Sequence, residues 1–203
     1  LSNFNREHVE LLRNNLENDG VNLKEEASIK DISQVGNKLT IQLEKSGKIT
    51  GSHLLVATGK KPNLQNLNLQ AAGINFSDIG IETDQYLRTN NKKIYAIGDV
   101  AQFQNVTNVA SYHAGIVLKS ITTGLKTRVQ KETQPRVIYT TPEIGSVGLS
   151  KTQAKRKYGN KLKISRVNFS ENDRAITDNK KLGWIEIYIY RNLVVGASVV
   201  GIG

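Results

Sequence analysis

Residues 93–100 read KIYAIGDV, an apolar run that stops abruptly at a glycine and an aspartate. The run predicts a buried strand over 93–97, and Gly98 suits a backbone that passes close to another group. Residues 54–63 read LLVATGKKPN, a second predicted strand that ends in the same way at Gly59. Ligands of open α/β sheets lie at the carboxyl ends of strands, so we expect a cofactor near both glycines. Asp99 adds an acceptor for a sugar-like hydroxyl, although plain connections can also carry a Gly-Asp turn.

The two motifs also carry a family resemblance. ATGKKPN at 57–63, followed by YAIGDV at 95–100, resembles the second half of a flavin-dependent pyridine nucleotide-disulfide oxidoreductase. That family includes dihydrolipoamide dehydrogenase, glutathione reductase and mercuric reductase. A third block, VIYTTPEIGSVGLS at 137–150, resembles the opening of the family's carboxyl-terminal dimerisation domain. SYHAG at 111–115 and NDRA at 172–175 are most similar to the mercuric reductase branch.

Periodicity and capping signals predict the remaining elements. Helices are expected over 7–18, over 109–122 with Thr107 or Asn108 as its cap, and from the capping box at Ser150 to Tyr158. Strands are expected over 21–23, 27–35, 38–43, 136–139, 145–149, 162–169, 184–190 and 194–200. With the resemblance, this order implies an α/β fold, a partial flavoprotein with two dinucleotide-binding domains, followed by an α+β dimerisation domain with an antiparallel sheet. The implied domains are the closing half of the NAD(P)-binding domain (1–58), the second FAD-domain segment (59–130) and the dimerisation domain (131–203).

The resemblance also implies roles for individual residues. Asp99 would accept hydrogen bonds from the ribityl chain of FAD, and Gly98 would allow that chain to approach. Gly59 would lie against NAD(P)H. The flavin's pyrimidine edge would face the first turn of a helix, formed by Thr107, Asn108, Val109 and Ala110. For each there is a plainer alternative, namely a turn cap for Asp99, a turn glycine for Gly59 and an ordinary core helix.

Composition excludes some chemistry. The 203 residues include no Cys, which removes disulfides, thiolate nucleophiles and zinc-thiolate sites. The resembled family works through a cysteine pair in its amino-terminal part, so we expect no catalytic residue in this chain. The three histidines have no metal-ligand spacing, and His113 either lines the cofactor cavity or is packed in the core. The net charge of +10 comes from scattered Lys and Arg without a nucleic-acid-binding motif. No apolar run is long enough to span a membrane and no secretory signal is present, so we expect a cytoplasmic protein.

The chain begins with Leu, contains no Met and has no Gly-x-Gly-x-x-Gly phosphate loop, so we expect a carboxyl-terminal fragment. The intact enzyme would transfer hydride from NAD(P)H through FAD to a cysteine pair outside this chain. Its substrate is left open among mercuric ion, lipoamide, glutathione and other disulfides. Expected partners are a second copy, bound through the carboxyl-terminal domain, and the missing amino-terminal half. The alternative is an inactive assembly or dimerisation module, or a split-gene remnant.

Overall fold

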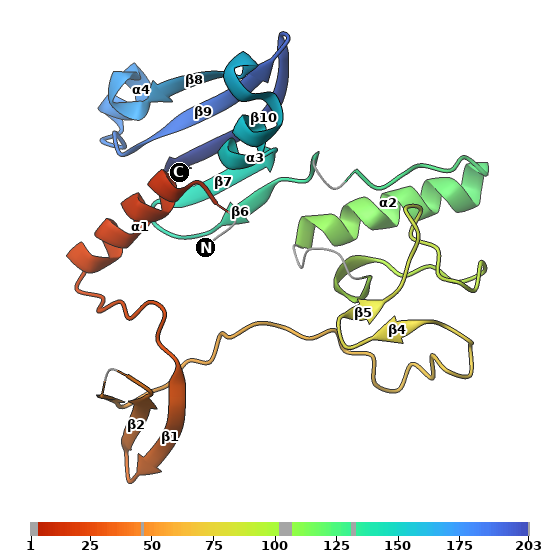
Figure 1. The fold of residues 1–203 in the computed structure, drawn as a ribbon, viewed down its shortest axis with the longest axis horizontal. Helices are drawn as coiled ribbons and strands as arrows, with labels where there is room; N and C mark the ends of the chain where they lie inside the picture. The colour runs from red at the N-terminus through yellow and green to blue at the C-terminus, as the bar shows by residue number, and fades with distance from the viewer. Residues whose placement is uncertain (1–3, 46, 102–106, 131–132, 203) are drawn as a thin grey trace. The chain divides into compact units, whose positions relative to one another are not determined.

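The computed structural model describes residues 4–45, 47–101, 107–130 and 133–202, without the side chains of residues 107 and 108 (Figure 1). The chain forms two compact units. The larger one combines residues 1–15 with 61–203, and the smaller one comprises residues 16–60. Helix α1 (Arg6–Asn18), which was predicted, begins in the larger unit and ends in the smaller one.

The smaller unit is built on a three-stranded antiparallel sheet. Its strands are β1 (Ile29–Val35), β2 (Lys38–Leu43) and β3 (Lys48–Gly51), in the order β1-β2-β3. The predicted strands over 27–35 and 38–43 are therefore confirmed, with the first starting two residues later. The predictions of strands over 21–23 and 54–57 are wrong. A strand needs a neighbour for its backbone N–H and C=O groups, and none of the described residues pairs with 54–57, where Leu55 is 89% exposed.

The middle of the larger unit contains short elements around a small apolar core. These are β4 (Phe76–Ser77), β5 (Gly80–Ile81), the 3-10 helix η1 (Gly98–Val100) and α2 (Thr107–Thr123). The core consists of Leu69, Ile74, Ile81, Ala96 and Ala101. Helix α2 confirms the prediction over 109–122. The prediction of a strand over 93–97 is wrong, because among the described residues the run makes a single isolated bridge, from Tyr95 to Arg88.

The carboxyl-terminal part forms a five-stranded antiparallel sheet in the order β6-β7-β10-β9-β8. The strands are β6 (Arg136–Ile138), β7 (Glu143–Gly148), β8 (Lys163–Asn168), β9 (Gly183–Tyr190) and β10 (Leu193–Gly201). Helix α3 (Lys151–Tyr158) follows β7, and its predicted capping box between Ser150 and Gln153 is formed. Short helices that the sequence did not predict are η3 (Gly159–Lys161), η4 (Phe169–Glu171) and α4 (Asp173–Thr177). The predicted antiparallel sheet is confirmed.

Strand β9 separates the two faces of this sheet. Glu186 and Tyr188 are buried on one face, whereas Ile185 and Ile187 alternate with them and belong to the other. The register places Glu186 opposite Ser198 and Ile185 opposite Val199 of β10. The first face is thus polar at its centre, and the second is apolar.

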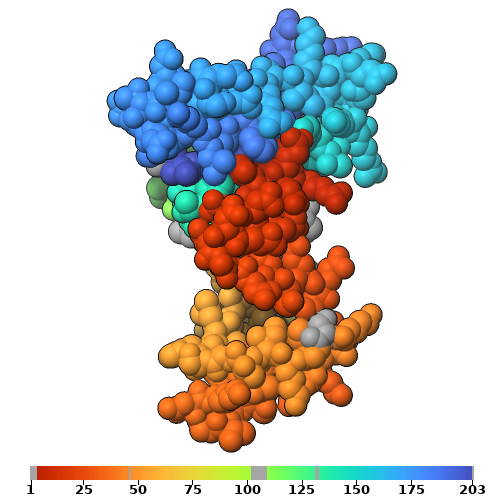
Figure 2. Space-filling model, turned by 90° about the vertical axis from the view of Figure 1, so that its left-hand side faces the viewer, coloured from red at the N-terminus to blue at the C-terminus, as the bar shows by residue number. Residues whose placement is uncertain are grey.

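Helix α1 packs on the polar face of the sheet. The Asn5 side-chain amide, one residue before the helix, donates to the Glu186 carboxylate over 3.0 Å. Near the carboxyl-terminal end of the helix, the Asn15 side-chain amide donates to the backbone carbonyl of Thr141 over 2.9 Å. Leu12 and His8 are buried between these two points. Figure 2 shows this red segment in direct contact with the blue carboxyl-terminal sheet.

Candidate functional site

The turn at Gly98 and Asp99 is formed by η1 and packs against α2. Gly98 is buried and has a φ of +69°, a conformation that residues with a side chain rarely adopt. A Cβ built on Gly98 would lie 3.2 Å from the Ala110 Cβ, tighter than ordinary contact. The glycine is therefore required both by its backbone angle and by the close approach of the helix.

His113, one turn after Ala110 on the same helix face, also contacts this turn. The Gly98 backbone N–H donates to the His113 Nδ1 over 3.2 Å, and both residues are buried. Because Nδ1 accepts this bond, we assign the ring as neutral with its proton on Nε2. Burial lowers the pKa of His113, which favours this neutral form. The structure thus places His113 in a packed position that also contacts the candidate site.

Asp99 itself is exposed, directly after the buried glycine. Residues 102–106, which follow this turn, lie outside the described part of the chain. The flavin contact of Asp99 stays a prediction.

The start of α2 supplies the other predicted flavin contacts. Thr107 and Asn108 lie within the helix rather than before it, so the residue that caps α2 falls outside the described residues. Val109 is buried and Ala110 is half-buried. A helix start presents N–H groups without intrahelical partners, so this turn can offer backbone donors to an anionic edge.

Gly59 belongs to the smaller unit and is exposed. Its φ of +127° is again one that favours glycine, and nothing lies within 4 Å of a Cβ built there. Backbone conformation therefore explains this glycine, and its contact with a nicotinamide dinucleotide stays a prediction.

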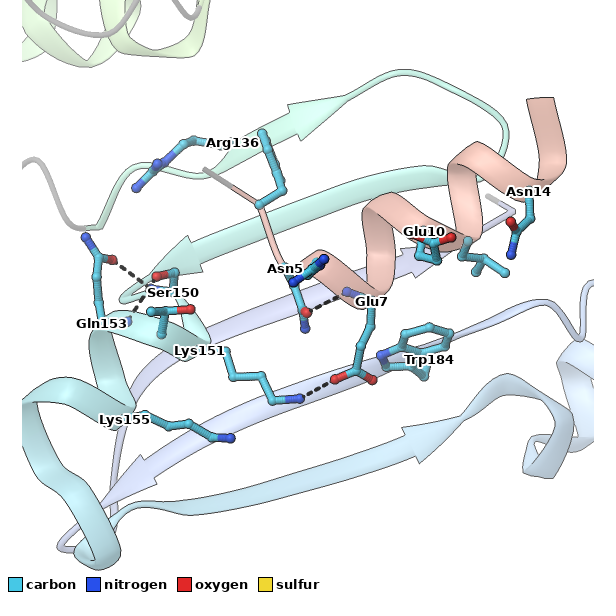
Figure 3. A pocket seen from close by; sticks show the side chains of 14 residues that line it. Asn5, Glu7, Glu10, Asn14, Arg136, Ser150, Lys151, Gln153, Lys155 and Trp184 are labelled. Atoms are coloured by element: carbon cyan, nitrogen blue, oxygen red, sulfur yellow. Dashed lines mark hydrogen bonds and ion pairs between the residues drawn. The ribbon is translucent and has the colours of Figure 1, made fainter. Parts of the chain in front are cut away.

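A cleft of about 880 Å³ lies elsewhere in the larger unit, between α1, the start of α3 and the sheet (Figure 3). Figure 3 shows Lys151 reaching Glu7, with Trp184 beside the pair. The Lys151 Nζ donates to Glu7 over 2.7 Å and to Glu186 over 2.9 Å. Burial opposes the charge of Lys151, but these two hydrogen bonds outweigh it and raise its pKa. The sequence analysis did not identify this cluster.

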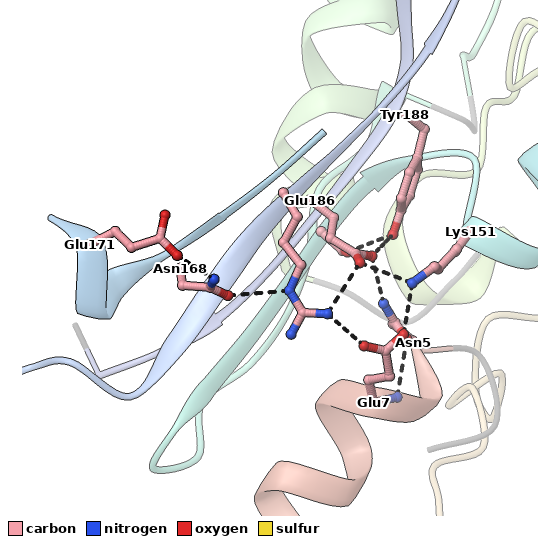
Figure 4. A network of polar contacts seen from close by, with 9 residues as sticks. Asn5, Glu7, Lys151, Asn168, Glu171, Glu186 and Tyr188 are labelled. Atoms are coloured by element: carbon pink, nitrogen blue, oxygen red, sulfur yellow. Dashed lines mark hydrogen bonds and ion pairs between the residues drawn. The ribbon is translucent and has the colours of Figure 1, made fainter. Parts of the chain in front are cut away.

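Glu186 is the centre of the network in Figure 4. Its side chain is only 2% exposed, and its carboxylate accepts hydrogen bonds from Lys151 and from the Asn5 amide. The Tyr188 hydroxyl donates a third hydrogen bond over 3.2 Å. The Tyr188 hydroxyl also shares a 2.7 Å hydrogen bond with Ser198. A buried carboxylate is stable only with such partners, so we interpret this network as the joint between α1, α3 and the sheet.

His8 is fully buried beside this network. Its ring meets Trp184 edge to face at 5.2 Å, and neither ring nitrogen has a hydrogen-bond partner among the described residues. Burial lowers the pKa of His8 to about 4, against the opposing charges of Glu186 and Glu7. The sequence analysis found no metal-ligand spacing for His8 and did not predict its burial against Trp184.

Comparison with known proteins identifies the family. Residues 1–116 match the pyridine nucleotide-disulphide oxidoreductase family, and residues 134–203 match its dimerisation domain. The chain belongs to the pyridine nucleotide-disulphide oxidoreductase family. Members of this family depend on FAD and use NAD(P)H. The predicted resemblance is confirmed.

Individual relatives agree with this assignment. The chain is 34% identical to a mercuric reductase of Bacillus cereus, over 98% of the chain and 32% of the relative. It is 32% identical to a dihydrolipoyl dehydrogenase of Bacillus subtilis, over 94% of the chain and 42% of the relative. Both names denote oxidoreductases. The chain therefore spans less than half the length of these relatives.

Solved structures confirm the predicted fold class. The crystal structure of LpdA from Mycobacterium tuberculosis matches with a TM-score of 0.90 and 22% identity, over 97% of this chain and 43% of that one. The HOCl-induced flavoprotein disulfide reductase RclA from Escherichia coli matches with a TM-score of 0.86 and 22% identity, over 100% of this chain and 47% of that one. Within the described ranges, no helix is long and apolar enough to cross a membrane. The cytoplasmic location stays a prediction.

The Glu186 network predicts the effect of removing its cation. Lys151→Met leaves the buried Glu186 carboxylate with only the more distant Arg166 guanidinium, 3.8 Å away, so we expect the free energy of unfolding to fall by about 2 kcal/mol in chemical denaturation. Adding Glu186→Gln should recover most of the loss, since the remaining amide carries no charge. Lys155→Met, at an exposed lysine one turn further along α3, is the matched control and should change stability by less than about 0.5 kcal/mol. If both lysine variants lowered the free energy of unfolding equally, the network around Glu186 would not stabilise the packing of α1 and α3 on the sheet.

The buried His8 predicts a pH dependence of stability. Its folded pKa of about 4 lies below the ordinary value of 6.5, so the unfolded chain takes up the proton first. Its contribution to stability is therefore lost as the pH falls from 6.5 to 4, by about 3 kcal/mol in total. His8→Leu should lack this component, while acidic residues titrate alike in both proteins. The measurement is the difference in unfolding free energy between the two proteins across this range, and a flat difference would refute the prediction.

Proposed function

We propose that this chain is part of an FAD-dependent NAD(P)H:disulfide-type oxidoreductase. In this proposal residues 1–58 close the NAD(P)-binding domain, residues 59–130 form the second FAD-domain segment, and residues 131–203 form the dimerisation domain. The observation that carries the proposal is the turn at Gly98 and Asp99. A buried glycine packed on α2 is followed there by the exposed residue Asp99, close to the start of that helix. These features fit a flavin with a polyol chain and an anionic ring edge.

In the proposed site each group has a distinct task. Asp99 accepts hydrogen bonds from ribityl hydroxyls. Gly98 has no side chain, so the ribityl chain can approach the backbone closely. Backbone N–H groups in the first turn of α2, at residues 107–110, stabilise negative charge on the pyrimidine edge through the helix dipole. The buried Val109 side chain anchors that turn in the core. Gly59 gives the second cofactor, NAD(P)H, a close approach to the backbone.

FAD, when bound, supplies two-electron chemistry, taking a hydride from NAD(P)H and passing the electrons to a disulfide. This chain contributes no thiol, because it has no Cys. The cysteine pair therefore belongs to a polypeptide segment outside these 203 residues. The part of the relatives' length that this chain leaves uncovered supports that inference. This chain's residues orient the cofactors and tune the flavin's charge.

The apolar face of the carboxyl-terminal sheet supports a homodimer. Ile185 and Val147 are each 38% exposed, and Val167 on the neighbouring strand is 54% exposed. The register brings Ile185 beside Val167 and Val199, so these side chains form one continuous surface. The family description of residues 134–203 as a dimerisation domain agrees with this assignment. In the proposal a second copy of the chain covers this face.

An inactive assembly module is the second candidate function. The absence of Cys favours it for the chain taken alone, and the apolar face serves it equally well. Flavin binding separates the two candidates, because a module that only assembles has no need for the Asp99 carboxylate.

The flavin assignment predicts binding of FAD, alone or together with the amino-terminal half of a related reductase. We expect Asp99→Ala to weaken FAD binding about tenfold or more, since each charge-assisted hydrogen bond contributes about 1.5 kcal/mol or more. Titration of FAD fluorescence and the flavin absorption spectrum measure this. Asp78→Ala, at another exposed aspartate of the same unit, should leave the affinity unchanged. Failure to take up flavin in either preparation would favour the assembly module, whereas unchanged binding by Asp99→Ala would reject the role of Asp99.

The dimer assignment predicts a monomer after a charge is placed on the apolar face. Ile185→Glu leaves the glutamate solvated in a single chain but buries it in the proposed interface, which disfavours association. Sedimentation velocity should show a dimer for the original chain and a monomer for the variant, with unchanged circular dichroism. Lys155→Glu, on the opposite side of the sheet, is the control and should remain dimeric. Identical association states for all three proteins would disprove this interface.

A further inference from the structure

We propose that His113 is the positioning residue that holds the turn at Gly98 and Asp99 in place. The inference deepens the proposed flavin site, on which its functional consequence rests. Its structural part stands on the hydrogen bond between the Gly98 N–H and the His113 Nδ1. No sequence motif assigns this role, because the two residues come from different elements and lie fifteen positions apart.

Two contacts from one face of α2 fix Gly98. Ala110 and His113 are three residues apart in the helix, so their side chains lie on the same face. A Cβ built on Gly98 would lie 3.2 Å from the Ala110 Cβ, so the helix leaves no room for a side chain there, and His113 accepts the Gly98 N–H. The first contact limits how far the turn can move toward the helix, and the second prevents it from moving away. Together, the two contacts restrict the turn at Gly98 to one position relative to α2.

The contact provides an acceptor for a buried backbone donor. Gly98 begins η1, and the N–H groups at the start of a helix have no partner within it. A buried N–H without an acceptor destabilises the folded state. His113 is fully buried on an otherwise apolar helix face with Val109 and Ile116, and its neutral ring supplies the acceptor. An apolar residue of similar size would fill the space but leave this donor unsatisfied.

The position of the turn determines where Asp99 can act. Asp99 follows Gly98 directly, so the orientation of the Gly98 peptide sets the direction of the Asp99 backbone. A hydrogen bond to a hydroxyl tolerates only a few tenths of an ångström around 2.7 Å. Loosening the turn by the loss of one hydrogen bond therefore weakens flavin binding without removing any group that touches the flavin.

Two substitutions separate acceptor chemistry from packing. His113→Leu keeps an apolar bulk and removes the acceptor, whereas His113→Gln keeps an oxygen that can accept the Gly98 N–H. We expect hydrogen exchange of the Gly98 amide, measured by NMR on the full chain without flavin, to be about tenfold faster in the Leu variant. FAD affinity should fall by a similar factor. The Gln variant should restore most of both quantities.

His8→Leu is the matched control, because His8 is also a fully buried histidine of the larger unit. The His8→Leu variant should change global stability. It should leave FAD affinity unchanged, and the exchange rate of the Gly98 amide relative to neighbouring amides should also stay the same. Unchanged Gly98 exchange in His113→Leu overturns the proposal, as does a folded Gln variant that behaves like Leu in both measurements. If the original chain binds no flavin in any preparation, the proposed function fails. The exchange of Gly98 then still decides whether His113 holds the turn.

Discussion

The larger unit depends on one buried negative charge. Glu186 is almost completely removed from water, and the desolvation of a carboxylate is too costly to leave uncompensated. Its donors come from three places in the chain, because Lys151 begins α3, Asn5 precedes α1 and Tyr188 lies on the same strand. Satisfying Glu186 therefore brings a helix from the amino-terminal end of the chain onto a sheet from the carboxyl-terminal end.

This arrangement assigns different tasks to the two sheet faces. Helices α1 and α3 use the polar face, through Glu186 and the edge-to-face contact of His8 with Trp184. The alternation of β9 then directs Ile185 and Ile187 to the opposite face, where the described residues leave them partly exposed. Internal assembly and the proposed association with a second copy thus do not compete for the same surface. The alternation of polar and apolar side chains along β9 produces both surfaces.

The sequence predicted the elements that local chemistry determines. The capping box at Ser150 and the alternation over 184–190 act within a few residues, and both are confirmed. The strands expected over 54–57 and 93–97 are absent, because apolar composition signals burial, whereas a strand requires a partner that the described residues do not provide. The Glu186 network was missed for a related reason. Asn5 and Glu186 are 181 residues apart, and no local pattern reports such a contact.

In the candidate site, too, the local motif could be predicted from the sequence, whereas the contact that holds it in place could not. The Gly-Asp pair could be found from the sequence, since a glycine after an apolar run marks a constrained backbone, and Gly98 has the positive φ that this implies. The sequence offered two interpretations of His113, and the structure adds a reason for its presence, an acceptor for a buried N–H. Both polar centres of the larger unit follow one rule. A polar group that folding removes from water, the Glu186 carboxylate or the Gly98 amide, acquires a partner from a distant element, and that partnership determines the geometry around it.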